Sequence, residues 1–188
     1  MTRTIALLAL LLATTVAFAD RFTPVKGSSV TVSGTSSLHD WTVKGNSIDG
    51  EVVAPQITQW GSSPAKVVVT IPVKSLKSEH TKMDQLMAKA LKADQHPTIR
   101  YELTTAVPAG DTTAFTAKTK GKVTVAGVTR DVDITVSGAR NSSGQYVLTG
   151  EAPLKMTDFG IKPPTAMLNT IKTGDVVKVK FLWVVEKK

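Results

Sequence analysis

Alternation of apolar and polar residues along most of the chain is the feature that most constrains its fold. It marks the segments 67–73, 99–103, 115–125, 132–136 and 177–185. In the third of these, Lys118, Lys120 and Lys122 alternate with small or apolar residues. Because successive side chains of a strand point to opposite faces, each segment is predicted to be a strand with one dry and one solvated face.

Weaker patterns add further strands and the turns between them. The residues around Val30 and Val32, the segment 36–44 and the pair Ile48/Val52 are predicted to be short strands. The residues 126–129 predict a tight hairpin turn, and 141–144 a second turn.

One segment has a helical period instead. Between Thr81 and Leu91, apolar residues recur three and four positions apart, and Pro97 follows. This predicts one short amphipathic helix, with Thr81 as its N-cap.

About eight strands with one dry face each must hide those faces together. The predicted fold class is an all-β, lipocalin-like antiparallel barrel of about eight strands with one short inserted helix. A two-sheet sandwich is the alternative, since alternation alone does not separate the two.

The N-terminus has the pattern of an export signal. Arg3 precedes the apolar run Ile5–Phe18, and Ala17-Phe18-Ala19 forms a small-x-small cleavage site. Residues 1–19 are therefore predicted to be a signal peptide, which leaves 20–188 as one mature domain in the periplasm or secreted. The run is shorter than the roughly 20 apolar residues that a membrane-spanning helix needs.

Composition excludes several classes of function. The 188 residues contain no Cys and three His, so Cys nucleophiles, disulfides and Cys-based metal sites are excluded. The net charge is +8, but the lysines alternate along strands and aromatic residues are only 5%, which argues against nucleic acid. The charge leaves room for a transient contact with an anionic membrane surface.

The densest polar cluster, Thr35 to Trp41, contains Ser, His and Asp, the residue types of a hydrolytic triad. On a strand, His39 and Asp40 would point to opposite faces, so the cluster is interpreted as a polar strand end with Trp41 packed inside. His80 and His96 lie at opposite ends of the predicted helix, too far apart to share a metal. No catalytic residue, metal site or cofactor is predicted.

Five segments, in this order and spacing, together resemble the YceI family of exported lipid-binding proteins. They are Ser36–Gly45, Met83–Glu102 with its Asp94–Tyr101 stretch, Gly121–Arg130, Asp158–Ile161 and Gly174–Val177. The resemblance implies a lipocalin-like barrel around an apolar channel for a polyisoprenoid or other long-chain amphiphile, and no catalysis. The segment from Ser33 to Gly45 departs from it, because it is richer in Ser, Thr and Asp than an apolar lining.

The first functional hypothesis is accordingly a periplasmic carrier of a long-chain apolar ligand. A structural or stress-related periplasmic protein and, third, an enzyme on a barrel scaffold are the alternatives. The helix is expected to cover one barrel opening. The predicted ligand contacts, chosen for adaptable or aromatic side chains near that opening, are Trp41, Met83, Leu86, Met87, Phe159, Ile161 and Met167.

Overall fold

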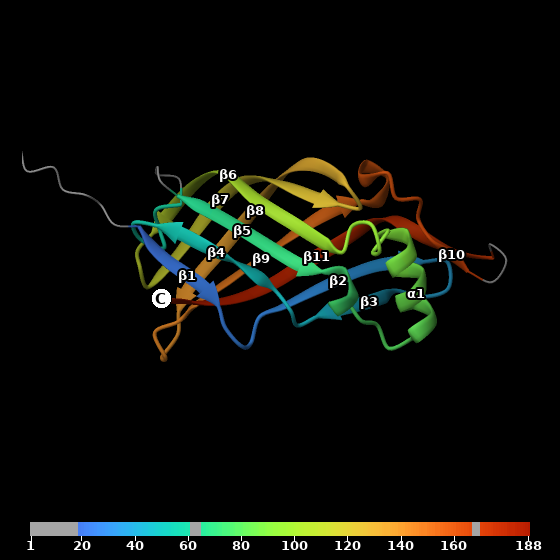
Figure 1. The fold of residues 1–188 in the computed structure, drawn as a ribbon, viewed down its shortest axis with the longest axis horizontal. Helices are drawn as coiled ribbons and strands as arrows, with labels where there is room; N and C mark the ends of the chain where they lie inside the picture. The colour runs from blue at the N-terminus through green and yellow to red at the C-terminus, as the bar shows by residue number, and fades with distance from the viewer. Residues whose placement is uncertain (1–18, 61–64, 167–169) are drawn as a thin grey trace, which may run out of the picture.

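A computed structural model describes residues 19–60, 65–166 and 170–188, and it consists mainly of long antiparallel strands (Figure 1). The elements are β1 (Asp20–Pro24), β2 (Ser29–Ser36), β3 (Trp41–Gly45), β4 (Asp49–Ala54), β5 (Lys66–Pro72), η1 (Val73–Ser75), α1 (Thr81–Ala90), β6 (Thr98–Gly110), β7 (Ala114–Val125), β8 (Val128–Arg140), β9 (Tyr146–Lys155), η2 (Met156–Phe159), β10 (Thr165–Ala166) and β11 (Ile171–Lys187).

Eight of the strands close into a ring. The sheet runs in the order β1-β4-β5-β6-β7-β8-β9-β11, and β11 then pairs with β1 through Phe22↔Lys187 and Pro24↔Val185. This pairing of the two ends of the domain makes the sheet a barrel, as predicted, and excludes the sandwich.

The strand β11 is long enough to serve three neighbours. One of its edges pairs with β9, while the other pairs first with β2 and then with β1. The hairpin of β2 and β3 extends the barrel wall beyond the ring at the end where α1 lies. There β3 is an outer strand of the sheet, and the backbone of Lys44 forms an isolated antiparallel β-bridge with that of Lys77.

The strand β7 shows how the alternating sequence builds the wall. Phe115, Ala117 and Thr119 point inward and are buried, whereas Lys118 and Lys120 are exposed. A two-residue turn, Ala126-Gly127, with positive φ at both positions, joins β7 to β8. This turn geometry matches the twist of the two strands, so the predicted hairpin is confirmed.

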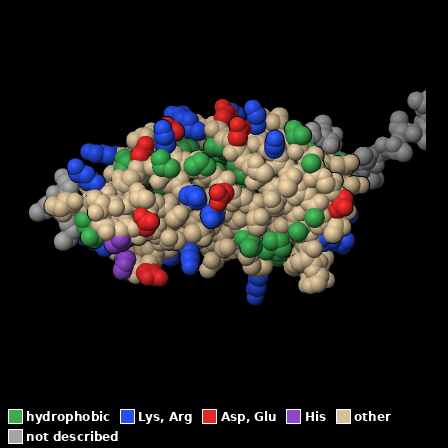
Figure 2. Space-filling model, turned by 180° about the vertical axis from the view of Figure 1, so that it is seen from behind, with side chains coloured by type: hydrophobic (Ala, Val, Ile, Leu, Met, Phe, Trp, Pro, Cys, Tyr) green, Lys and Arg blue, Asp and Glu red, His purple; other side chains and the backbone are tan. Residues whose placement is uncertain are grey.

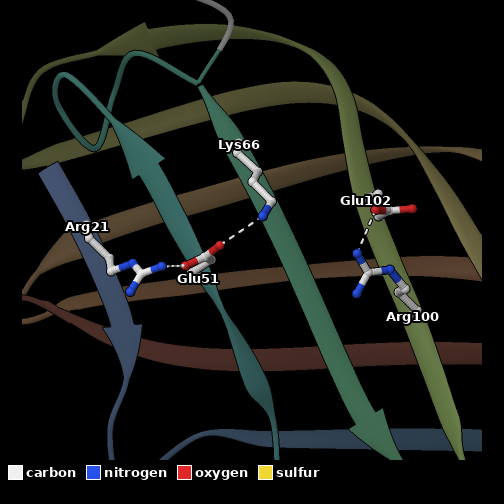
Figure 3. A network of polar contacts seen from close by, with 5 residues as sticks. All are labelled: Arg21, Glu51, Lys66, Arg100 and Glu102. Atoms are coloured by element: carbon white, nitrogen blue, oxygen red, sulfur yellow. Dashed lines mark hydrogen bonds and ion pairs between the residues drawn. The ribbon is translucent and has the colours of Figure 1, made fainter. Parts of the chain in front are cut away.

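Ion pairs cross the outer face of the barrel near its seam. Glu51 on β4 contacts Arg21 on β1 at 2.7 Å and Lys66 on β5 at 3.0 Å, so one carboxylate joins three neighbouring strands (Figure 3). The hydrogen bond from Lys66, together with the charges of Arg21 and Lys66, lowers the pKa of Glu51. On the next strand, Arg100 and Glu102 form a separate pair at 2.7 Å.

Two local predictions are wrong. The segment 36–44 is not one strand: β2 ends at Ser36, and a turn separates it from β3. The Ser36 hydroxyl holds this turn, donating to the His39 carbonyl oxygen (2.7 Å) and accepting from the N–H groups of Leu38 and His39. His39 and Asp40 therefore lie in a turn and not on opposite faces of a strand.

The predicted helix is present, but its first residue is Thr81 and its N-cap is His80, which makes no side-chain capping bond. The start of the helix is instead tied down by Asp84, whose carboxylate accepts from the backbone N–H (2.7 Å) and hydroxyl (2.8 Å) of Ser78. Among the described residues, no helix is long and apolar enough to cross a membrane.

Candidate functional site

The barrel encloses a cavity of about 500 Å³. Its walls come mainly from the inward faces of the strands, where Val and Ile are the most frequent residues. Strands of 12 or 13 residues, tilted by about 40°, give a barrel roughly 30–35 Å long. Small inward residues on a closed eight-stranded wall leave the interior only partly filled, and an elongated apolar space results.

The helix α1 lies across one end of this space (Figure 1). Met83, Leu86 and Met87 line the cavity, as the helical period predicts, and none of the helix residues is buried. The helix therefore covers the opening with an apolar face but contributes little to the packed core. We call this end of the barrel the mouth.

The other predicted contacts also lie on the cavity wall, with one exception. Trp41 lines the mouth, where its indole N–H donates to the Thr35 carbonyl oxygen at 3.1 Å. Phe159 and Ile161 are buried on the opposite side of the mouth, packed with Val123 and Val125. The structure thus brings six of the seven residues around one cavity, and Met167 lies outside the described residues. Their contact with a ligand remains a prediction.

The far end of the cavity is closed by aromatic side chains. Trp60, in the segment between β4 and β5, meets Phe115 edge to face with ring centroids 5.4 Å apart. Trp183 on β11 lines the same space. All three tryptophans of the chain therefore border the cavity.

The middle of the cavity contains one polar pair. The hydroxyl of Tyr101 donates to that of Thr119 (3.4 Å), which donates in turn to the Ile134 carbonyl oxygen (2.8 Å). Burial raises the pKa of Tyr101, so its phenol stays neutral. Both hydroxyls have hydrogen-bond partners within the barrel wall, and neither carries a charge, so the middle of the cavity is uncharged.

Apart from Tyr101, the titratable side chains among the described residues that line the cavity all lie at the mouth. Lys82 of α1, His80 before it, Lys155 at the end of β9 and His39 in the β2–β3 turn all line it. Among the described residues that form the lining, none is Asp or Glu. Figure 2 shows histidine side chains at the end of the molecule where α1 lies.

The polar cluster around Ser36 is not arranged for hydrolysis. The Ser36 hydroxyl is engaged in its own turn, and Nδ1 of His39 lies 2.8 Å from the Asp40 carbonyl oxygen instead of a carboxylate. In the part of the chain that the structure describes, no group of three or more His, Asp or Glu residues could hold a metal ion.

Sequence reasoning missed most of the cavity wall and all four basic mouth residues. The cavity wall could have been predicted from the alternating pattern, because the apolar positions of the predicted strands line the cavity. They include Val69, Ile71, Ile99, Tyr101 and Phe181. Nothing in the local sequence around His39, His80, Lys82 or Lys155 indicates that they meet, since three separate segments converge only in the folded chain.

The fold and the cavity define a class: closed antiparallel barrels with a single covering helix and an apolar interior. A family model described as the YceI-like domain matches residues 13–185. The chain belongs to this family, and the resemblance noted from its sequence is confirmed. No curated protein matches it.

Solved structures support the same fold. A polyisoprenoid-binding domain from Saccharophagus degradans aligns with a TM-score of 0.70 at 13% identity, covering 89% of this chain and 98% of that one. BcnA of Burkholderia cenocepacia aligns with a TM-score of 0.67 at 18% identity, covering 84% and 95%. The Campylobacter jejuni YceI protein gives 0.57 at 18%, covering 78% and 84%. At these identities the likeness shows the fold.

Proposed function

We propose that this protein binds one long-chain apolar or amphiphilic lipid of the polyisoprenoid class inside its barrel and carries it. The observation that carries the proposal is the elongated cavity, apolar along its length and charged only at the mouth. Such a lining offers a hydrocarbon chain burial at about 25 cal/mol per Å², and its charged side chains stand apart from the length of the chain, at the mouth. The name of the Saccharophagus degradans neighbour supports the same class of ligand.

The carrier is proposed to act in the periplasm or outside the cell, after removal of residues 1–19. The first strand supports this, because β1 begins at Asp20 and its carboxylate pairs with Lys187 at 2.7 Å. A mature chain starting at Asp20 would thus retain every strand of the barrel. Intact mass of the protein from the extracellular and periplasmic fractions of its host tests this; a protein found only inside the cell, with residues 1–19 attached, would refute it.

Native mass spectrometry of the protein purified from its own host tests the carrier function. We expect a co-purifying isoprenoid or other long-chain lipid in the wild-type protein. Ala152→Trp should abolish retention, because Ala152 is buried in the cavity wall and a Trp there fills the space. Glu151→Trp is the matched control, since the neighbouring side chain is exposed on the outside. An empty wild-type cavity, or equal retention in both variants, would contradict the proposal.

A further inference from the structure

We propose that the apolar ligand enters and leaves the barrel through its side wall, between β8 and β9, and that the short helix η2 is the gate of this route. The inference rests on the proposed function, because it assigns the path by which that ligand reaches the cavity. The covering helix α1 stays in place during exchange, and η2 moves.

The strands β8 and β9 separate before the wall ends. Their pairing runs from Arg140↔Tyr146 to Thr135↔Glu151 and stops there. Residues 128–134 of β8 continue along β7, and residues 152–155 of β9 continue along β11. The four residues of β9 that no longer pair with β8 border a slit about 13 Å long, at about 3.3 Å per residue. We call this unpaired stretch the side slit.

A groove on the outer wall leads to the side slit. Its lining comes from β8, β9, η2 and β11. Five of the lining residues also line the cavity inside the barrel, namely Val132, Ala152, Leu154, Lys155 and Phe159. Because the same side chains face both spaces, a single layer of side chains separates the groove from the interior.

The outer surface of the side slit is apolar, whereas the wall around it is charged. Val176 is 51% exposed and lines the groove together with Pro153. The next outward positions along β11 are Lys178 and Lys180, both exposed to solvent. A hydrocarbon chain therefore finds apolar contacts on the outside of the slit and again at Leu154, on the way to the interior.

The helix η2 fills the side slit and contacts β8, β9 and β11. Phe159 is its one buried residue, and it belongs to an apolar cluster against which Val132 and Leu154 pack. Gly160 follows with a φ of +68°, so the chain turns sharply where the helix ends. Displacing η2 would thus move four residues and uncover one buried side chain, whose contacts a passing hydrocarbon chain can replace.

One carboxylate fastens η2 to the barrel wall. Asp175 on β11 accepts hydrogen bonds from the backbone N–H (2.9 Å) and the hydroxyl (2.7 Å) of Thr157. Thr157 is exposed, so water can replace both hydrogen bonds when η2 moves. Release therefore leaves no buried polar group without a partner, and it stays reversible.

The start of α1 is fastened in the same way, which supplies a matched control. Asp84 accepts from the backbone N–H (2.7 Å) and the hydroxyl (2.8 Å) of Ser78. Each carboxylate thus holds one element beside the cavity through two hydrogen bonds from a single residue. Replacing either Asp175 or Asp84 by Ala removes the same charge but loosens a different opening.

Rates of ligand exchange in Asp175→Ala and Asp84→Ala test the route. Geranylgeraniol is bound to the protein, and its release to excess phosphatidylcholine vesicles is followed by stopped-flow tryptophan fluorescence, since all three tryptophans border the cavity. We expect Asp175→Ala to raise the association and release rates about tenfold, because hydrogen bonds to a charged group hold the gate. Its Kd should stay within about twofold of the wild-type value, because both rates rise together. Asp84→Ala should leave both rates unchanged.

Amide hydrogen exchange supplies a second readout. The N–H groups of Gly160 and Ile161 donate to carbonyl oxygens within η2, at 3.0 Å each. In Asp175→Ala they should exchange about tenfold faster, while the amides of α1 and β7 keep their wild-type rates. Thr157→Val retains the backbone hydrogen bond to Asp175 and loses only that of the hydroxyl, so it should accelerate ligand exchange by a smaller factor.

Three outcomes would overturn the side route. They are faster ligand exchange in Asp84→Ala alone, equal acceleration in both Ala variants, and wild-type rates in Asp175→Ala. The first would place the route under α1, and the second would show a general loosening of the barrel. Each leaves the proposed function standing, because the wild-type protein still binds geranylgeraniol. Failure of the wild-type protein to bind it would contradict the proposed function itself, and the side route with it.

Discussion

Replacing Met87 by Asp is the sharpest test of whether α1 takes part in binding. Met87 lines the cavity from the helix and is half-buried. Its neighbours three and four positions away along the helix are Met83, Asp84, Ala90 and Leu91, so a new carboxylate would find no cation on the helix. An unpaired charge would then face the ligand chain.

The expected effects on folding and binding differ in size. Full burial of a Met side chain contributes about 1.5–3 kcal/mol, so losing a half-buried one costs the fold about 1 kcal/mol. Without ligand the new carboxylate stays hydrated, because no residue of α1 is buried. With ligand it loses that water, at a cost of about 2–3 kcal/mol, which corresponds to a roughly 30- to 150-fold weaker affinity.

The assay measures geranylgeraniol affinity by tryptophan fluorescence alongside urea unfolding. Gln85→Asp is the matched control: it makes the same change of charge on the exposed face of α1, within reach of Lys82 and Lys89. We expect near wild-type affinity in the control and a large loss in Met87→Asp. Equal affinities would remove α1 from the site, and an unfolded Met87→Asp protein would show that the helix is part of the core.

Three further predictions concern the barrel wall. The triple variant Lys118→Gln/Lys120→Gln/Lys122→Gln should change the free energy of unfolding by less than about 1 kcal/mol in urea melts, since all three side chains are exposed, and a larger loss would mean that they are packed. Gly121→Ala should destabilise the protein by about 1–3 kcal/mol, because a Cβ there would collide with the Tyr101 ring. The loss of stability should be smaller when Tyr101→Ala is added. An unchanged melting temperature of Gly121→Ala would contradict the close approach of Gly121 to Tyr101. Glu51→Gln should lower stability at pH 7 by up to about 1 kcal/mol. Because the folded pKa of Glu51 is lowered, its contribution is present above the ordinary pKa of about 4.3 and is lost as the pH falls through the folded value. The difference in stability between the two proteins should therefore shrink as the pH falls below about 4.3, and a difference that stays constant over that range would refute the ionic origin.

The sequence predicted the strands well wherever one face is solvated. The alternating pattern located β5 to β9 because polar side chains such as Lys118 mark the outer face of each strand, and Val or Phe side chains mark the inner face. It failed where local hydrogen bonding replaces the strand, as in the turn that the Ser36 hydroxyl holds. It also failed to extend β11 back to Ile171, because Lys172 to Asp175 lack apolar alternation and are held by pairing with β2 and β10.

Closure of the barrel depends on contacts that no local pattern contains. The pairing of Phe22 with Lys187 joins the two ends of the domain, and only this contact distinguishes a barrel from a sandwich. The candidate site shows the same division. Met83 and Met87 were predicted from a helical period, whereas the placement of Lys82 and Lys155 on one cavity follows from tertiary structure alone.

The dependence of the seam on β11 has a consequence for biosynthesis. The Val184 N–H donates to the Ser28 hydroxyl, a partner 156 positions earlier, so the wall is completed by a strand that is synthesised after all the other described strands. Contacts of this range form late and slowly, because a long loop must close first. Until β11 arrives, β1, β2 and β9 present unpaired edges, the state in which a chain aggregates most readily. This interval is therefore the one in which a holding chaperone would find exposed strand edges to bind.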